Sequence, residues 1–157
     1  MILLNFDNKI KGTATVDKHD GWIVCQSINF GVGRAVKASS GKKARDASAP
    51  SFSEITFTRQ SDVASPDLFM QAIAGKSLGK ADVHFVSNAD NSVQVSLKIE
   101  LHDAMITSYT LNGSSDSPTE TIAVNFAKIS KQFDSFNGAK VTTGTPKKWD
   151  LTTNKTF

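Results

Sequence analysis

Apolar and polar residues alternate with a period of two along most of the chain. The clearest run spans Ser92 to His102, where every second residue is apolar: Val93, Val95, Leu97, Ile99 and Leu101. Because successive strand side chains point to opposite faces of a sheet, this run predicts a strand with one buried and one solvated face. Similar runs predict strands beginning at Ile2, Trp22, Ile55, Ala81, Met105 and Glu120, the last reaching Ile129. Trp149 and Leu151 alternate like a final strand, so the pattern predicts a mainly β domain.

One segment has the helical period instead. Ser65 offers a capping hydroxyl, Pro66 stands at the first helical position and Asp67 lies in the first turn. The apolar residues that follow recur at helical spacing: Leu68, Phe69, Ala72 and Ile73. Gly75 is a suitable stop signal. The sequence therefore predicts one helix over about 65–75, too short to be stable unless it packs on the sheet.

Residues 32–50 follow neither period and concentrate positive charge. Five basic residues lie there, namely Arg34, Lys37, Lys42, Lys43 and Arg45, against the single acid Asp46. This gives the segment +4, whereas the whole chain carries +3. A structureless segment of this length is uncommon inside a compact domain. It is either disordered or ordered by a neighbouring subunit, on which Val32 and Val36 could anchor it while the basic side chains meet acids.

Length and composition fit a single domain over residues 1–157, since 39% of the residues are apolar. The net charge of +3 is too small to indicate nucleic-acid binding, and no aromatic residue lies between 32 and 50. The single cysteine, Cys25, excludes an intramolecular disulfide. No basic group flanks Cys25 closely, so we expect a packed thiol rather than a nucleophile.

The N-terminus lacks a basic region followed by a long apolar region, so we expect no cleaved signal peptide. No stretch approaches the roughly 20 apolar residues that a membrane helix needs. We therefore expect synthesis in the cytoplasm, no membrane insertion, and export, if any, by a route without a cleaved signal.

Motifs that would carry chemistry are incomplete. His19, His84 and His102 are far apart in sequence, and none stands at metal-ligand spacing. His19-Asp20 and His102-Asp103 form pairs that metal phosphohydrolases also use, but without further ligands nearby. Gly31-Val32-Gly33 begins like a dinucleotide loop and Gly41-Lys42 resembles part of a phosphate loop, but position 36 is Val where both need Gly, and Lys43 stands where the phosphate loop needs Ser or Thr. We expect no enzyme activity, catalytic residue, cofactor or metal site.

The order of features resembles a known family. The strand from Trp22 to Phe30 ends in Gly31-Val32-Gly33-Arg34, and the basic segment follows. Then come Pro50-Ser51-Phe52-Ser53-Glu54-Ile55-Thr56-Phe57-Thr58-Arg59, Asp62 and Ser65-Pro66-Asp67-Leu68-Phe69. The blocks Leu101 to Tyr109 and Glu120 to Ile129 complete the set. Over nearly the whole chain this closely resembles the Hcp (haemolysin-coregulated protein) family of bacterial type VI secretion.

The resemblance implies a two-sheet antiparallel β-barrel with one short flanking helix, about 65–75, and a long extended loop, about 32–50. It implies hexameric rings that stack into a tube, with a spike protein, a contractile sheath and small effector proteins in the lumen as partners. The tube is expelled to the extracellular space. In this family the long loop reaches a neighbouring subunit or ring. The implied subunit interface therefore includes Arg34, Lys37, Lys42, Lys43 and Arg45, and reversing Lys42 and Lys43 to glutamate should weaken assembly.

Three other readings stay open from the residues alone. A small ligand- or carbohydrate-binding β-sandwich would need exposed aromatic residues, whereas Trp22 and Trp149 look at least partly buried by phase. A hydrolase could assemble a site from Glu54, Asp62 and His84, which would require a cleft with shifted pKa values. A transmembrane β-barrel is favoured by the alternation but opposed by the absent signal and the charged strand faces.

Overall fold

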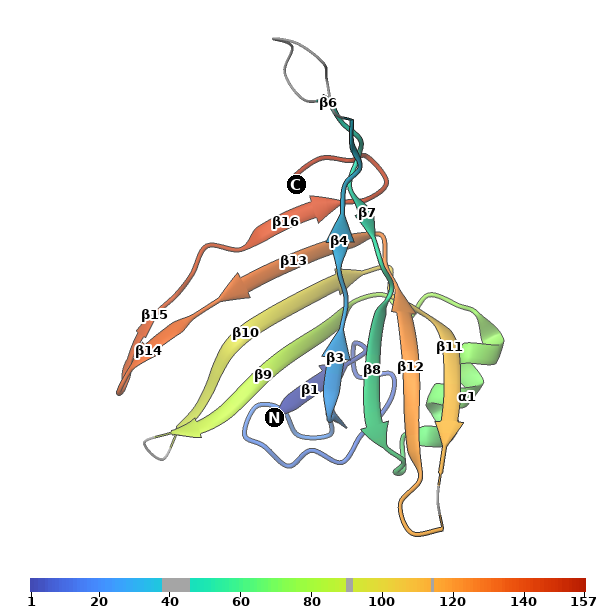
Figure 1. Cartoon of the computed structure of the whole chain (residues 1–157). Helices are drawn as coiled ribbons and strands as arrows, with labels where there is room; N and C mark the ends of the chain where they lie inside the picture. Colours follow the sequence, from blue (N-terminus) through green and yellow to red (C-terminus); the bar gives the residue numbers. More distant parts are fainter. Residues whose placement is uncertain (38–45, 90–91, 114) are drawn as a thin grey trace.

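Two antiparallel sheets form the body of the protein, as the computed structural model shows for residues 1–37, 46–89, 92–113 and 115–157 (Figure 1). The six-stranded sheet has the order β16 (Lys147–Asp150), β13 (Lys128–Phe133), β10 (Ser92–His102), β9 (Ala81–Ala89), β1 (Ile2–Asn5) and β2 (Ile23–Cys25). The four-stranded sheet has the order β11 (Met105–Asn112), β12 (Thr119–Asn125), β8 (Ile55–Gln60) and β3 (Ser27–Asn29). The predicted fold class, mainly β with two antiparallel sheets and one short helix, is confirmed.

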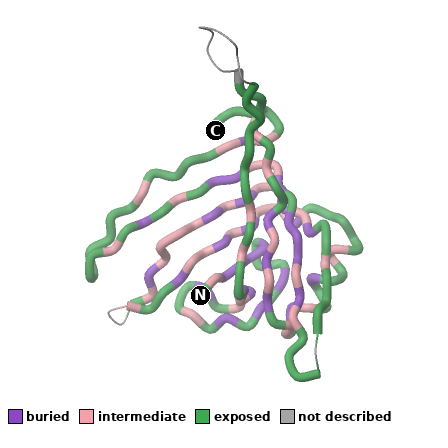
Figure 2. The backbone as a smooth tube through the Cα atoms, in the orientation of Figure 1, coloured by how far each residue is buried: buried purple, intermediate pink, exposed green. Residues whose placement is uncertain are grey.

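The main core lies between the sheets and is built from alternate residues of their strands (Figure 2). Its buried side chains include Leu4, Phe6, Ile23, Cys25, Ile55, Phe57, Val83, Ile99, Leu101, Ile122 and Val124. The chain passes between the sheets at Gln26 and again at Phe126–Ala127. The single long strand predicted from Glu120 to Ile129 is therefore wrong: Phe126 enters the core, and the strand divides into β12 and β13 in different sheets.

A β-bulge changes which face of β10 is buried. The register between β10 and β9 shifts between Val95 and Leu97. Val93 and Val95 consequently pack on a second apolar cluster around Leu3 and Val86, whereas Leu97 packs on the main core. The prediction that the apolar residues of this strand share one face is wrong, because a bulge inserts one residue and exchanges the two faces.

A second β-bulge changes which residues of β11 are buried. The alternating residues Met105, Thr107, Tyr109 and Leu111 predict one shared face, but the register with β12 shifts between Ile106 and Ser108. Ile106 is buried and Tyr109 is half-buried, while Thr107 and Leu111 are exposed. The strand is confirmed, but the prediction that the four alternating residues share a buried face is wrong.

Helix α1 (Ser65–Ala74) packs beside β11 and buries Leu68 (Figure 1). Gly75 ends the helix in the left-handed region at φ 58°, as predicted, and its N–H donates to the Gln71 carbonyl over 3.0 Å. Ser65 does not cap the helix. Its hydroxyl accepts the Asp62 backbone N–H (2.9 Å) and donates to Glu120 (3.0 Å). No helix in the described ranges has the length and apolar character needed to cross a membrane.

The described part of the segment predicted as a long loop is a narrow hairpin that projects from the body (Figure 1). Strand β4 (Val32–Gly33) pairs with β7 (Ser51–Phe52), and β5 (Val36–Lys37) pairs with β6 (Asp46–Ala47). We call residues 31–37 and 46–53 the arm. A second small hairpin, β14 (Ser135–Asn137) with β15 (Lys140–Thr142), follows β13.

Candidate assembly surface

The arm carries apolar and basic side chains into solvent. Val32 and Val36 are 58% and 54% exposed, and Arg34 and Lys37 are exposed as well. Among the side chains that the structure describes, which do not include that of Asp46, neither Arg34 nor Lys37 forms an ion pair. The backbone of the arm is held by its own hydrogen bonds, such as Ser48 N–H to the Ala35 carbonyl over 2.9 Å. The arm is thus an ordered element that leaves the side chains of Val32, Val36, Arg34 and Lys37 exposed to solvent.

A groove of about 450 Å³ opens where the arm joins the body, and we call it the basal groove. One wall is formed by Phe30 and by the arm residues Val32, Arg34, Pro50 and Phe52. The other wall is formed by β13, β16 and the C-terminal segment, with Ile129, Lys131, Lys147, Lys148, Trp149 and Thr156. Phe52 meets Phe126 edge-on, with ring centroids 6.3 Å apart. This contact links the base of the arm to the main core.

The basal groove combines an apolar floor with a cationic rim. Four of its residues are basic, Arg34, Lys131, Lys147 and Lys148, and its described lining contains no carboxylate. Strand pairing brings two of them together, since Lys131 lies opposite Lys147 in the ladder between β13 and β16. Such a surface favours a partner that brings apolar side chains and carboxylates.

A second exposed apolar surface lies around α1 and β11, away from the arm (Figure 1). Its large exposed side chains are Val63 (70%), Phe69 (47%), Met70 (54%), Ile73 (63%) and Leu111 (59%). Phe69 also packs edge-on against Tyr109, with ring centroids 5.7 Å apart. A soluble monomer rarely exposes contiguous apolar patches of this kind without an interaction function.

Buried charges in the body have a structural role. Arg59 and Glu120 are both fully buried and pair through Nη1 and Oε1 at 2.6 Å, and Arg59 also pairs with Asp62. Tyr109 donates its hydroxyl to Glu120 over 2.6 Å. Burial, together with that hydrogen bond, raises the pKa of Tyr109 to about 12. Burial also raises the pKa of the Cys25 thiol to about 12, which fits the predicted packed thiol.

The predicted site residues are distributed as follows. Arg34 and Lys37 lie on the arm, whereas Lys42, Lys43 and Arg45 lie outside the described residues. The lysines of the basal groove were missed, because they are about a hundred residues from Arg34 in the sequence and only the fold brings them together.

The three residues of the hydrolase reading do not meet. Glu54 accepts the Thr107 hydroxyl (2.9 Å), Asp62 pairs with Arg59, and His84 bonds to His19 (2.8 Å). Across the described part of the chain, no group of three or more His, Cys, Asp or Glu side chains could hold a metal ion.

Solved structures with the same fold come from type VI secretion. One, described as a type six secretion system protein, is 24% identical, covers 99% of this chain and 98% of its own, and has a TM-score of 0.89. Hcp1 from Salmonella typhimurium is 21% identical over 99% and 97% of the two chains, with a TM-score of 0.78. A type VI secretion system effector from Yersinia pestis is 20% identical over 96% and 99%, with a TM-score of 0.73.

The family comparison is more specific than the shared fold. No curated protein sequence matches the chain. The family described as "Type VI secretion system effector, Hcp" matches residues 3–133, which include the four-stranded sheet, the six-stranded sheet apart from β16, the arm and α1. The chain therefore belongs to the Hcp family of type VI secretion.

Proposed function

We propose that this protein is the subunit of hexameric rings that stack into the inner tube of a type VI secretion apparatus. Membership of the Hcp family makes it a secreted tube protein rather than a member of an enzyme family. In this proposal the protein is made in the cytoplasm and expelled without a cleaved signal peptide. Its partners are further copies of itself, the spike and sheath of the apparatus, and small effectors in the lumen.

The observation that carries the proposal is the exposed arm. An ordered hairpin that presents Val32 and Val36 to water, together with the exposed basic residues Arg34 and Lys37, is suited to a contact with another chain. We assign the subunit contact to Arg34 and Lys37, and we keep Lys42, Lys43 and Arg45 as predicted members of it.

Closure of a ring requires two different contact surfaces on each subunit, and two exposed apolar surfaces of this chain are candidates for them. A head-to-tail ring uses two different patches on every subunit. The arm with its basal groove forms one apolar surface, and the α1 face forms another. In addition, β16 and β11 lie at the outer edges of the two sheets, where backbone N–H and C=O groups can pair with another chain.

Light scattering coupled to gel filtration, followed by negative-stain imaging, tests the proposal. We expect wild-type protein to reach the mass of six chains and to form rings. The double charge reversal R34E/K37E should reduce the mass toward one chain. K11E/K18E makes the same charge change at two exposed lysines outside the arm and should leave rings intact. A wild-type monomer without rings, or intact R34E/K37E rings, would contradict the proposal.

A further inference from the structure

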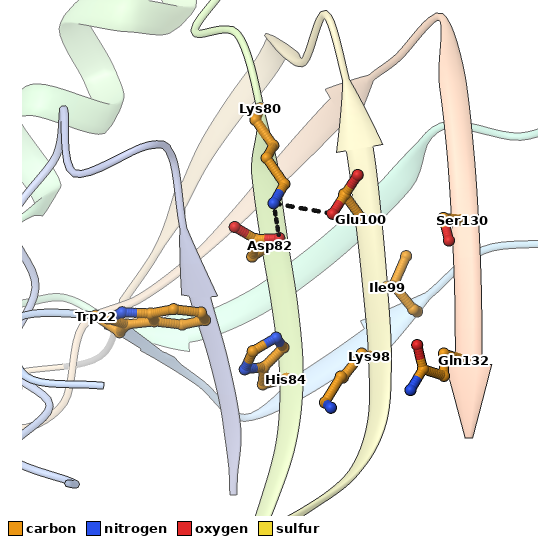
Figure 3. Close-up of a pocket in the computed structure, with 9 residues that line it drawn as sticks. All are labelled: Trp22, Lys80, Asp82, His84, Lys98, Ile99, Glu100, Ser130 and Gln132. Atoms are coloured by element: carbon orange, nitrogen blue, oxygen red, sulfur yellow. Dashed lines mark ion pairs between the residues drawn. The ribbon is translucent and has the colours of Figure 1, made fainter. Parts of the chain in front are cut away.

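A polar cleft lies on the face of the six-stranded sheet that points away from the main core (Figure 3). Its volume is about 340 Å³, within the range of small-molecule sites. Side chains of β9 and β10 form its floor, among them Asp82 and His84 of β9 and Lys98 and Glu100 of β10. Trp22 forms one side and Gln132 of β13 another.

The indole of Trp22 is held firmly at this cleft. The loop over residues 6–22 folds back on itself, and the Ala14 N–H donates to the Trp22 carbonyl over 3.0 Å. A side chain at Gly12 would collide with the Trp22 backbone, so this close approach requires glycine. The ring packs against His19 and His84, with centroids 4.6 and 4.8 Å away. An aromatic wall fixed in this way loses little entropy when a ligand packs on it.

The two histidines set the hydrogen-bonding state of the cleft. His19 Nδ1 lies 2.9 Å from the Asp17 carbonyl, which can only accept, so this nitrogen carries a proton. In the neutral pair, His84 Nδ1–H then donates to His19 Nε2 over 2.8 Å. His84 Nε2 is left as an acceptor, and no described residue bonds to it. Burial, and then the neighbouring charges of His19, Lys98 and Lys80, lower the pKa of His84 to about 4, which keeps it neutral at pH 7.

The charges of the cleft balance one another. Lys80 Nζ bridges Asp82 (3.1 Å) and Glu100 (2.8 Å), as the dashed lines of Figure 3 mark. Lys98 pairs with Asp134 at 2.9 Å. Two lysines and two carboxylates line the cleft, so an ionic ligand would meet a like charge whichever sign it carried. The carboxylates, His84 and the Gln132 amide still offer acceptors and donors to a ligand without net charge.

We propose that this cleft binds a neutral saccharide. The C–H face of a sugar ring packs on the indole of Trp22, and its hydroxyl groups bond to Asp82, Glu100 and His84. A flat apolar wall beside several polar groups with no net charge matches a ligand that is itself apolar on its faces and polar at its rim. None of these residues lies on the arm or in the basal groove, so variants of the cleft and variants of the arm test sugar binding and ring assembly separately.

Titration of ¹⁵N-labelled protein with D-glucose, D-galactose and N-acetylglucosamine, followed by NMR, tests it. We expect one of these sugars to shift the Trp22 indole N–H and the β9 and β10 amides saturably. The Trp149 indole, which lies in the basal groove, is the internal control and should stay still. Sugar concentrations up to about 100 mM detect dissociation constants in the millimolar range.

The variant Glu100→Gln retains the shape of the side chain but removes its charge. It should weaken binding about tenfold, since the hydrogen bond from the sugar hydroxyl then has a neutral acceptor in place of a charged one. Trp149→Phe should bind as wild type. The proposal is overturned if none of the three sugars gives a saturable shift at Trp22, or if Glu100→Gln binds as tightly as wild type.

Discussion

Two arginines show that charged side chains of the body and of the arm differ in burial and in pairing. Arg59 is fully buried and meets the carboxylates of Glu120 and Asp62 within its own chain. Arg34 is exposed on the arm and pairs with none of the carboxylates whose side chains the structure describes. A buried guanidinium must be paired inside the monomer, because an unpaired buried charge is very costly. An exposed one carries no such requirement and can be matched by another chain.

The two regions therefore differ in role: the body is stabilised by contacts within the chain, whereas the arm exposes side chains that another chain can contact. The Glu120 carboxylate accepts hydrogen bonds from Arg59, Ser65 and Tyr109, and so connects β8, α1 and β11. The described part of the arm is held by hydrogen bonds between its own two strands and by the contact of Phe52 with Phe126 at its base. Changes in the body should therefore act on stability, and changes in the arm should act on association.

The largest effect is expected from Glu120→Ala. It leaves Arg59 buried with only the half-buried Asp62 as partner, and breaking such a buried pair costs about 3–5 kcal/mol. Urea unfolding followed by tryptophan fluorescence measures the loss. Glu54→Ala, at an exposed carboxylate, is the control and should change stability by less than about 0.5 kcal/mol. Similar costs for both variants would mean that the buried network is not what joins α1 to the sheet.

A smaller effect is expected from Tyr109→Phe. The variant keeps the ring packing on Phe69 but removes the 2.6 Å hydrogen bond to Glu120, at a cost of about 1.5–3 kcal/mol. The same substitution in a Glu120→Gln background should cost clearly less, because the charged acceptor is gone. Equal costs in the two backgrounds would show that the phenol acts through something other than Glu120.

Lowering the pH should remove a third, more local contribution to stability, that of the Asp134 carboxylate. Hydrogen bonds from Gln132, Lys98 and the Gly144 backbone lower the pKa of Asp134 to about 2. An acid whose pKa is lower in the folded state stabilises the fold above its ordinary value of 3.8, and that stability is lost as the pH falls toward 2. Urea midpoints from pH 7 to pH 2 should therefore converge for wild type and Asp134→Asn. A difference that stays constant over this range would exclude the carboxylate as the cause.

The smallest effect on stability is expected at the arm. Val32→Asp should change the free energy of unfolding by less than about 0.5 kcal/mol, since Val32 is already 58% exposed. It should nevertheless abolish ring formation in light scattering. Val141→Asp, at a valine that is 51% exposed on the β14–β15 hairpin, is the matched control for both measurements. Loss of stability at Val32 comparable to that of Glu120→Ala would erase the distinction between arm and body.

Alternation in the sequence predicts most strands of the body, because each has one face toward a core. It does not show where the chain passes from one sheet to the other, so the predicted strands Trp22 to Phe30 and Glu120 to Ile129 each divide between the two sheets. It could not show which face is buried beyond Val95 or before Ser108, since a bulge becomes visible only when the register with the neighbouring strand is known. The two histidines at the polar cleft are 65 residues apart, and nothing in either local sequence signals their contact. The basal groove was missed for the same reason, although its arm residue Arg34 was predicted.

Hydrogen exchange of the arm at two protein concentrations tests the central claim most directly. Peptides covering 31–37 and 46–53 should exchange fast in dilute solution, where short exposed ladders open easily, and slowly at concentrations where rings form. Peptides from β9 and β10 should be equally protected at both. Protection of the arm that does not change on assembly would contradict the claim that a second copy of the chain completes it.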